Sequence, residues 1–406
     1  MALILVVLLL TALPLGWIGF EDLGEALTYA GRITGAVLIL VSATTLVGAA
    51  ALVDHWFRNS FPYSGIVALI GTVAALLANV MFLLEAFKDG DSTAYRVLWC
   101  LLTAGSAWAV FAVWRTSVEV PAPKRLAAAV IISSGLALAN FGYQYLYQPN
   151  QHGAKPVITM TMGKAVLSPD HKAFAVPVDI RLENHSDVGF YVLGTEFHAM
   201  GERVPLSSKD RLREQWRADA EQWSRVSERH PLSRREIHQP GELVAAQPWM
   251  PVGNWIEAGD AFFTQTVVQL PIDTPYDQLA FYATADFARK DRLGLEQIHP
   301  IGNSWSGRDQ VPQWLKRQKD SDTVIYHARV HENNAIATHT MDPRYLTVYW
   351  QFGTSGAAVS ETILRQGEED RERSGAETRE MTSRYGLVQA MIGPVERPLW
   401  DIKSQR

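Results

Sequence analysis

Two histidines in the C-terminal part of the sequence, His327 and His331, are of a type that could bind a metal. On a helix, a spacing of four would place both imidazoles on one side, where they could share an ion. The surrounding segment instead alternates apolar and polar residues, which predicts a strand. One face of that strand would carry His327, Arg329 and His331. Because an arginine between the histidines disfavours a bound cation, we interpret this face as a solvent-exposed polar surface.

The sequence contains no recognised catalytic or phosphate-binding motif. The run GNSWSG at residues 302–307 does not match the serine-hydrolase pattern G-x-S-x-G. His331-Glu332 is not followed by a second histidine at the zinc-protease spacing, and neither glycine-rich nucleotide motif occurs. The sequence therefore predicts no catalytic residue, no cofactor and no metal site. An enzyme whose site is assembled from scattered residues stays open as a minor alternative.

Asp286, Lys290 and Asp291 lie close together at the end of a predicted strand. They could form a binding turn, but charged residues at a strand end are more often simply solvated. We therefore expect a solvated turn here.

The composition divides the chain into two parts. The first 149 of the 406 residues hold only seven Lys or Arg and eight Asp or Glu, so most charges lie in the C-terminal part. That part has a net charge of about −4, which argues against binding to nucleic acid or to anionic lipid. The single cysteine, Cys100, lies in an apolar run and is most simply a buried packing residue. The C-terminal part therefore has no intramolecular disulfide.

Five apolar runs in the N-terminal part are each close to the ~20 residues that a helix needs to cross a bilayer. The predicted spans are Ala2–Phe20, Ile33–Val53, Tyr63–Leu84, Val97–Trp114 and Leu126–Tyr147. The first could instead be a cleaved signal peptide, but it lacks a basic start and a clear cleavage site. Either alternative leaves the C-terminal part on the same side of the membrane.

Basic residues in the connections predict the orientation. The connection before the last span carries Arg115, Lys124 and Arg125, which the positive-inside rule places in the cytoplasm. The margin over the other side is one residue. We therefore predict a multi-pass protein of a bacterial inner membrane, with its C-terminal domain outside the cytoplasm.

The spans contain small polar residues but no ionisable residue in mid-span, which argues against a pump or secondary transporter. Gly31 with Gly35, and Gly71 with Ala75, have the small-xxx-small spacing that lets helices approach closely. This spacing indicates packing within one bundle, with homodimerisation as the alternative. The bilayer is thus one predicted partner, and a second copy or another protein is a further candidate.

After a polar hinge at residues 148–155, residues 156–406 predict a mostly antiparallel β-sandwich resembling immunoglobulin-like modules at the level of fold. Its clearest strand alternates five large apolar residues with Ala175, Pro177 and three charged residues over residues 174–183. Pro177 cannot donate to a ladder, so we expect this strand to lie at an edge or to have position 177 unpaired. Further strands are expected at Val157–Val166, Phe190–Met200, Ala261–Leu270, Gln278–Phe287, Val324–His331 and Tyr345–Phe352, with a turn at Asn333-Asn334.

Two amphipathic helices are expected in this domain. Ser374–Met391 begins with a capping-box spacing between Ser374 and Glu377. Ser208–Glu228 is an insertion with one apolar stripe, formed by Leu212, Trp216, Trp223 and Val226. The stripe either covers an open face of the sheet or docks a protein partner. Leu212, Trp216 and Trp223 are the candidate binding residues of the sequence.

Three functions remain open at this stage. The leading hypothesis is a non-enzymatic membrane protein that presents a β-sandwich outside the cytoplasm to a ligand or protein, or that forms a subunit of an envelope assembly. The first alternative is a sensor or effector with its β domain in the cytosol, coupled to the helix bundle. The second is a membrane-linked enzyme without a recognisable motif.

Overall fold

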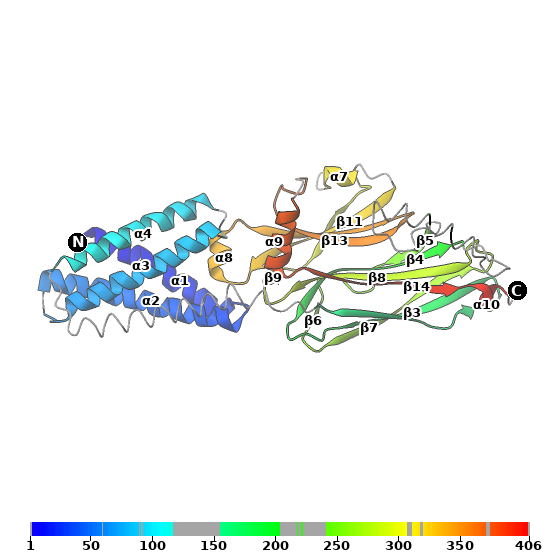
Figure 1. The fold of residues 1–406 in the computed structure, drawn as a ribbon, viewed down its shortest axis with the longest axis horizontal. Helices are drawn as coiled ribbons and strands as arrows, with labels where there is room; N and C mark the ends of the chain where they lie inside the picture. Colours follow the sequence, from blue (N-terminus) through cyan, green and yellow to red (C-terminus); the bar gives the residue numbers. More distant parts are fainter. Residues whose placement is uncertain are drawn as a thin grey trace. The chain divides into compact units, whose positions relative to one another are not determined.

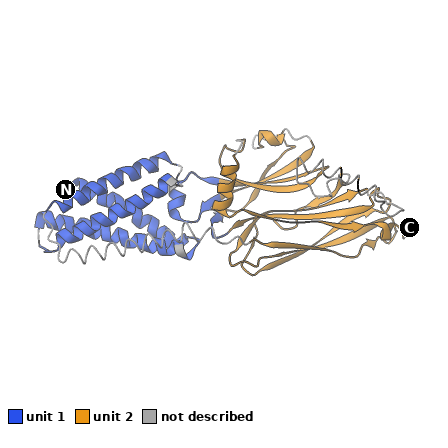
Figure 2. Ribbon diagram, in the orientation of Figure 1, with its two compact units in different colours: residues 1–153, 290–294, 330–344 blue, residues 154–289, 295–329, 345–406 orange. Residues whose placement is uncertain are grey.

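A computed structural model describes residues 2–58, 60–88, 90, 92–116, 155–203, 217, 221, 241–306, 311–316, 320–370 and 374–404. The chain forms two compact units, coloured separately in Figure 2. Unit 1 comprises Met1–Gly153 together with Lys290–Gly294 and Val330–Arg344. Unit 2 comprises Ala154–Arg289, Leu295–Arg329 and Tyr345–Arg406. Two short segments from the C-terminal part of the sequence therefore belong to the helical unit.

Unit 1 is built on four long helices, which Figure 1 shows lying side by side. They are α1 (Ala2–Glu25), α2 (Tyr29–Val53, extended by the π-helical turn η1 at Asp54–Arg58), α3 (Ser64–Lys88) and α4 (Thr93–Trp114). All four are long and apolar enough to cross a membrane, so the described residues contain four candidate membrane spans. The predicted fifth span, Leu126–Tyr147, lies outside the described residues, as does the hinge up to residue 154.

The first helix continues past its predicted end. We expected it to stop at Phe20 and Glu21 to begin a loop, but α1 runs to Glu25. Two acidic residues, Glu21 and Asp22, are therefore helical. Both have hydrogen-bond partners in a distant part of the chain, which the local sequence could not reveal.

Small residues let the helices of one bundle approach closely. A Cβ atom on Gly71 of α3 would lie 2.6 Å from the Cα atom of Gly48 of α2, and one on Gly35 would lie 2.6 Å from the carbonyl oxygen of Gly19 of α1. Two members of the small-xxx-small pairs therefore pack within this chain. Cys100 was expected to be buried, but it lies on the exposed side of α4.

A buried amide joins three helices in the middle of the bundle. The Nδ2 atom of Asn79 on α3 lies 2.7 Å from Oγ of Ser106 on α4 and 3.0 Å from Oγ1 of Thr11 on α1. Interhelical hydrogen bonds of this kind contribute on the order of 1 kcal/mol each in membrane proteins. Asn79 therefore helps to fix the register of α1, α3 and α4.

Unit 2 consists mainly of three antiparallel sheets (Figure 1). Sheet A has the order β1-β3-β2, with β7 also paired to β3; its strands are β1 (Val157–Met162), β2 (Val166–Leu167), β3 (Ala173–Glu183) and β7 (Ala261–Pro271). Sheet B has the order β14-β8-β4-β5, with β6 also paired to β4; its strands are β4 (Phe190–Glu202), β5 (Glu242–Gln247), β6 (Trp255–Ile256), β8 (Gln278–Arg289) and β14 (Val388–Pro398). Sheet C has the order β10-β11-β12-β13, with β9 also paired to β11; its strands are β9 (Leu293–Leu295), β10 (His299–Asn303), β11 (Ser321–Glu332), β12 (Arg344–Gly353) and β13 (Gly356–Arg365). In the described part of the chain, the short helices that accompany the sheets or connect their strands are α7 (Gln313–Lys316), α8 (Ala335–Thr340, in unit 1), α9 (Gly375–Tyr385) and α10 (Trp400–Lys403).

Sheets A and B share one apolar core. The alternation predicted for the first clear strand is confirmed, since its five apolar side chains are all buried in this core: Phe174, Val176, Val178, Ile180 and Leu182. The predicted face of β8 is confirmed in the same way, with Leu279, Phe281, Ala283, Ala285 and Phe287 buried. Antiparallel strands whose alternate residues meet across two sheets form the two layers of a sandwich.

The strand that contains Pro177 is not at an edge, because β3 pairs with β1 and β2 on one side and with β7 on the other. The second expected alternative is confirmed, because position 177 is unpaired on the side of β1 and β2, while it stays in register with Val267 of β7. The β1 ladder ends at Val178 and the β2 ladder begins at Ala175, so position 177 faces the interruption between them. The carbonyl of Pro177 accepts a hydrogen bond from the Gly163 amide there. The expected strand Val157–Val166 is accordingly interrupted and ends at Met162.

The last predicted helix is shorter than expected. Its start is confirmed, because Ser374 and Glu377 form a complete capping box. Its end is not at Met391, because Gly386 adopts a left-handed conformation with φ of 61° and terminates α9 after Tyr385. The chain then enters β14 at Val388 and pairs with β8.

We expect Phe287→Ala to lower the free energy of unfolding of the β unit by about 3–5 kcal/mol, because a buried ring leaves a cavity. Met391→Ala on the adjacent strand is the matched control. Its side chain is 69% exposed, so the loss should stay within about 0.5 kcal/mol. Denaturant unfolding of the full chain in detergent measures both. Equal losses would contradict the assignment of Phe287 to the core.

Candidate functional site

A short helix from the C-terminal part of the sequence is packed into the helical unit. Between β11 and β12 we expected only a turn at Asn333-Asn334, but the chain there forms α8. Ala335 at its start belongs to the same buried apolar cluster as Phe82 of α3 and Trp99 of α4, and Ile336 packs against this cluster. Helix α8 is therefore part of the core of unit 1.

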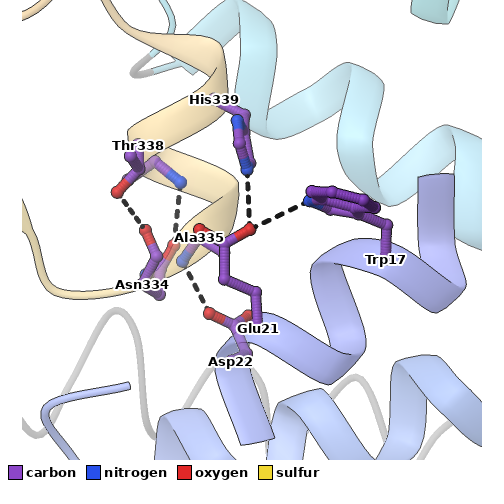
Figure 3. A network of polar contacts seen from close by, with 8 residues as sticks. Trp17, Glu21, Asp22, Asn334, Ala335, Thr338 and His339 are labelled. Atoms are coloured by element: carbon purple, nitrogen blue, oxygen red, sulfur yellow. Dashed lines mark hydrogen bonds and ion pairs between the residues drawn. The ribbon is translucent and has the colours of Figure 1, made fainter. Parts of the chain in front are cut away.

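A carboxylate on α1 holds the first turn of α8 (Figure 3). Oδ1 of Asp22 accepts a hydrogen bond of 2.6 Å from the backbone N–H of Ala335, and Asp22 is only 1% exposed. The side chain of Asn334, which caps α8, accepts a second bond of 2.8 Å from the N–H of Ala337. Two of the amide groups that a helix leaves unpaired at its start are thus satisfied, and the negative charge lies at the favourable end of the helix dipole.

The neighbouring carboxylate on α1 holds the last turn of the same helix. Oε2 of Glu21 lies 2.9 Å from Nε2 of His339 and 3.1 Å from Nε1 of Trp17 (Figure 3). Because the carboxylate only accepts, His339 must carry its proton on Nε2 in this arrangement. We call the set Trp17, Glu21, Asp22, Asn334, Ala335 and His339 the α8 dock.

The α8 dock positions a helix and contains no nucleophile aligned with a base. Its contacts join residues more than 300 positions apart in the sequence, so no local pattern could have predicted them. The one available signal was a pair of adjacent acidic residues at the end of an apolar run, which the sequence analysis assigned to a loop. The arrangement fixes both turns of α8 against α1.

A second polar cluster is buried within unit 2. We expected Asp286 to lie in a solvated turn with Lys290 and Asp291, but its side chain is fully buried in β8. Its Oδ1 atom accepts a 2.8 Å hydrogen bond from Nε2 of Gln389 on β14. Burial, followed by the charge and hydrogen bond of Glu361, raises the pKa of Asp286 to about 9. Asp286 is therefore protonated at neutral pH and can donate to Glu361.

A carboxylate and an imidazole lie on the neighbouring strand β4. Oε1 of Glu196 lies 2.8 Å from Nδ1 of His198, whose ring stacks on Tyr282 with 4.6 Å between centroids. Burial raises the pKa of Glu196, and the hydrogen bond and charge of His198 partly oppose this shift. Glu196 is fully buried, so substrate could not reach it without a rearrangement. This pair therefore contributes polar structure to sheet B.

The candidate residues from the sequence meet different outcomes. Leu212, Trp216 and Trp223, with the rest of the expected helix Ser208–Glu228 except positions 217 and 221, lie outside the described residues. Their role as a partner site stays a prediction. His327 and His331 are in a strand, β11, as expected, but both are half-buried, whereas a solvent-exposed face was predicted; of that face, only Arg329 is exposed. Within the described part of the chain, no group of three or more His, Cys, Asp or Glu could hold a metal ion.

Comparison with known proteins adds little to this description. No protein-family profile matches the chain, and no curated protein matches it. Among solved structures, it is similar to the sporulation control protein Spo0M from Bacillus subtilis, with 10% identity over 60% of this chain and 91% of that one, at a TM-score of 0.20. A protein from Bordetella pertussis described as ApaA matches 34% of this chain and 80% of its own, with 10% identity and a TM-score of 0.20. Scores this low support no conclusion about function.

The raised pKa of Asp286 predicts a pH dependence of stability. Because the folded state keeps a proton that the unfolded state releases near pH 4, stability should fall as pH rises from about 4 to about 9. The slope from this residue should be at most roughly 1.4 kcal/mol per pH unit.

Asp286→Asn should remove this contribution, because an amide can still accept from Gln389 and donate to Glu361 without ionising. Unfolding of the full chain in detergent at several pH values measures the effect. Asp260→Asn, at an exposed aspartate, is the control and should keep the parental slope. A parental slope in Asp286→Asn would contradict the assignment.

Proposed function

We propose that this chain is a non-enzymatic, multi-pass membrane protein whose β domain binds a ligand or protein partner and is coupled to the helix bundle through α8. The α8 dock is the observation that carries this proposal. A simple tether would need only a flexible linker. Here, a helix enclosed between two long strands is held by two carboxylates and buried against α3 and α4.

The α8 dock is suited to coupling because the buried carboxylate of Asp22 relies on the backbone amide of Ala335 for its hydrogen bond. Asp22 is buried, and its Oδ2 atom has no hydrogen-bond partner among the described residues. Removal of the Ala335 amide would leave a buried carboxylate without its principal partner, which is costly. A movement of β11 or β12 that shifted α8 would therefore act directly on the end of α1.

The position of α8 also bears on topology. It packs at the end of the bundle where α1 finishes and α4 begins, as shown by its cluster with Ile18 and Trp99. The end of α4, at Val113, clusters with Ile4 at the start of α1. If these helices span the membrane, α4 ends on the side opposite α8. An additional crossing would reconcile the two positions, as the predicted span Leu126–Tyr147 would provide.

The charge pattern supports one orientation for the bundle. Arg115, at the end of α4, begins the connection that the positive-inside rule assigns to the cytoplasm. The opposite end of the bundle, where α8 packs, would then be outside. We accordingly favour an immunoglobulin-like sandwich exposed outside the cytoplasm over a cytosolic sensor domain, although the same coupling would serve either.

Asp22→Ala should loosen α8 without unfolding the bundle. Loss of a helix-capping carboxylate costs about 1 kcal/mol, so amide hydrogens in residues 335–340 should exchange roughly five- to tenfold faster. Hydrogen exchange of the full chain in detergent, read by mass spectrometry, measures this. Glu25→Ala, at an exposed acid on the same helix, should leave the exchange unchanged. Equal exchange in Asp22→Ala and the parent would overturn the coupling proposal.

The orientation is tested by a reporter after Arg406. We expect alkaline phosphatase, which is active only outside the cytoplasm, to be active there, and a fluorescent protein that matures only inside to remain dark. The reverse pattern would place the β domain in the cytosol and favour the sensor alternative.

A further inference from the structure

Two histidines occupy directly opposed positions on neighbouring strands of sheet C. His299 of β10 pairs with His327 of β11 in the antiparallel register. Opposed residues of an antiparallel pair point to the same face, with Cβ atoms about 4.5–5.5 Å apart. Two imidazoles at this spacing can direct one nitrogen each toward a shared ion, because Zn–N bonds are about 2.0–2.1 Å long.

Each imidazole has its Nδ1 atom engaged and its Nε2 atom available. Nδ1 of His299 lies 3.1 Å from the carbonyl oxygen of Gln297, so it must be the protonated nitrogen. Nδ1 of His327 lies 3.3 Å from Oγ1 of Thr347, and the ring stacks on Tyr345 at 4.9 Å between centroids. Neither Nε2 atom has a hydrogen bond to a described residue. Metal-bound histidines are typically oriented in this way by the partner of their other nitrogen.

The electrostatic surroundings also suit a cation. Burial, and then the charge of His299, lower the pKa of His327, while the charge of Glu369 acts in the opposite direction. The effect of the Glu369 charge on His327 indicates that a carboxylate lies in the neighbourhood of the pair.

We propose that His299 and His327 form a two-histidine site for a divalent transition-metal ion on the surface of sheet C. The described residues supply no third ligand in position, so water would complete the coordination. Two neutral imidazoles select borderline ions such as Zn²⁺ over Mg²⁺ or Ca²⁺, which prefer oxygen ligands. The pair differs from the combination considered on sequence grounds, because His331 lies four residues further along β11.

Isothermal titration of the full chain in detergent with Zn²⁺ tests the proposal. The chain has eleven histidines, so the comparison between variants decides. We expect His299→Ala and His327→Ala each to weaken one binding event by at least tenfold. His185→Ala is the matched control, since His185 is exposed and lies 3.4 Å from a carboxylate oxygen of Glu183 but has no second histidine beside it in the described chain. It should bind as the parent does.

A second readout is independent of heat signals. A metal that joins β10 to β11 stabilises the folded state by mass action, so Zn²⁺ should raise the unfolding temperature of the parent and of His185→Ala, but not of His299→Ala. His299 is exposed, and its replacement should leave the fold intact by circular dichroism. Failure of the parent to bind Zn²⁺ at millimolar concentration would overturn the proposal. Equal binding by the parent and both pair variants would do the same.

Discussion

The hydrogen bond between Asp22 and the first amide of α8 holds this helix against α1 within unit 1. A buried carboxylate at the end of an apolar helix is costly unless its charge is compensated. The amide of Ala335 and the positive end of the α8 dipole provide that compensation. Because the partner comes from the C-terminal part of the sequence, the helical unit is incomplete without residues 330–344.

The β unit also contains buried carboxyl groups, but they lie in a sheet and not at the start of a helix. Sheets A and B meet through alternating apolar side chains, which leaves polar residues of β4 and β8 on the other face of sheet B. There, Asp286 is paired with Gln389 and Glu361, and Glu196 with His198. Protonation makes the burial of Asp286 tolerable, whereas Asp22 relies on a helix start. In both arrangements, the neighbouring groups determine how the buried carboxyl group is stabilised.

Helix α8 packs with α3 and α4 inside unit 1, and in the chain it lies between β11 and β12 of sheet C. Glu21 and His339 extend the attachment to the last turn of α8.

Apolar patterning determined the candidate spans and the alternating faces of β3 and β8, and the spacing of Ser374 and Glu377 determined the capped start of α9, because each depends on residues close together in the sequence. The same reasoning failed where distant residues intervene. Glu21 and Asp22 extended α1 beyond its predicted end because their partners lie on α8, and Asp286 was buried by residues on β13 and β14. The α8 dock and the His299–His327 pair likewise exist only through tertiary pairing, since strand register and helix docking bring together groups that no local spacing relates.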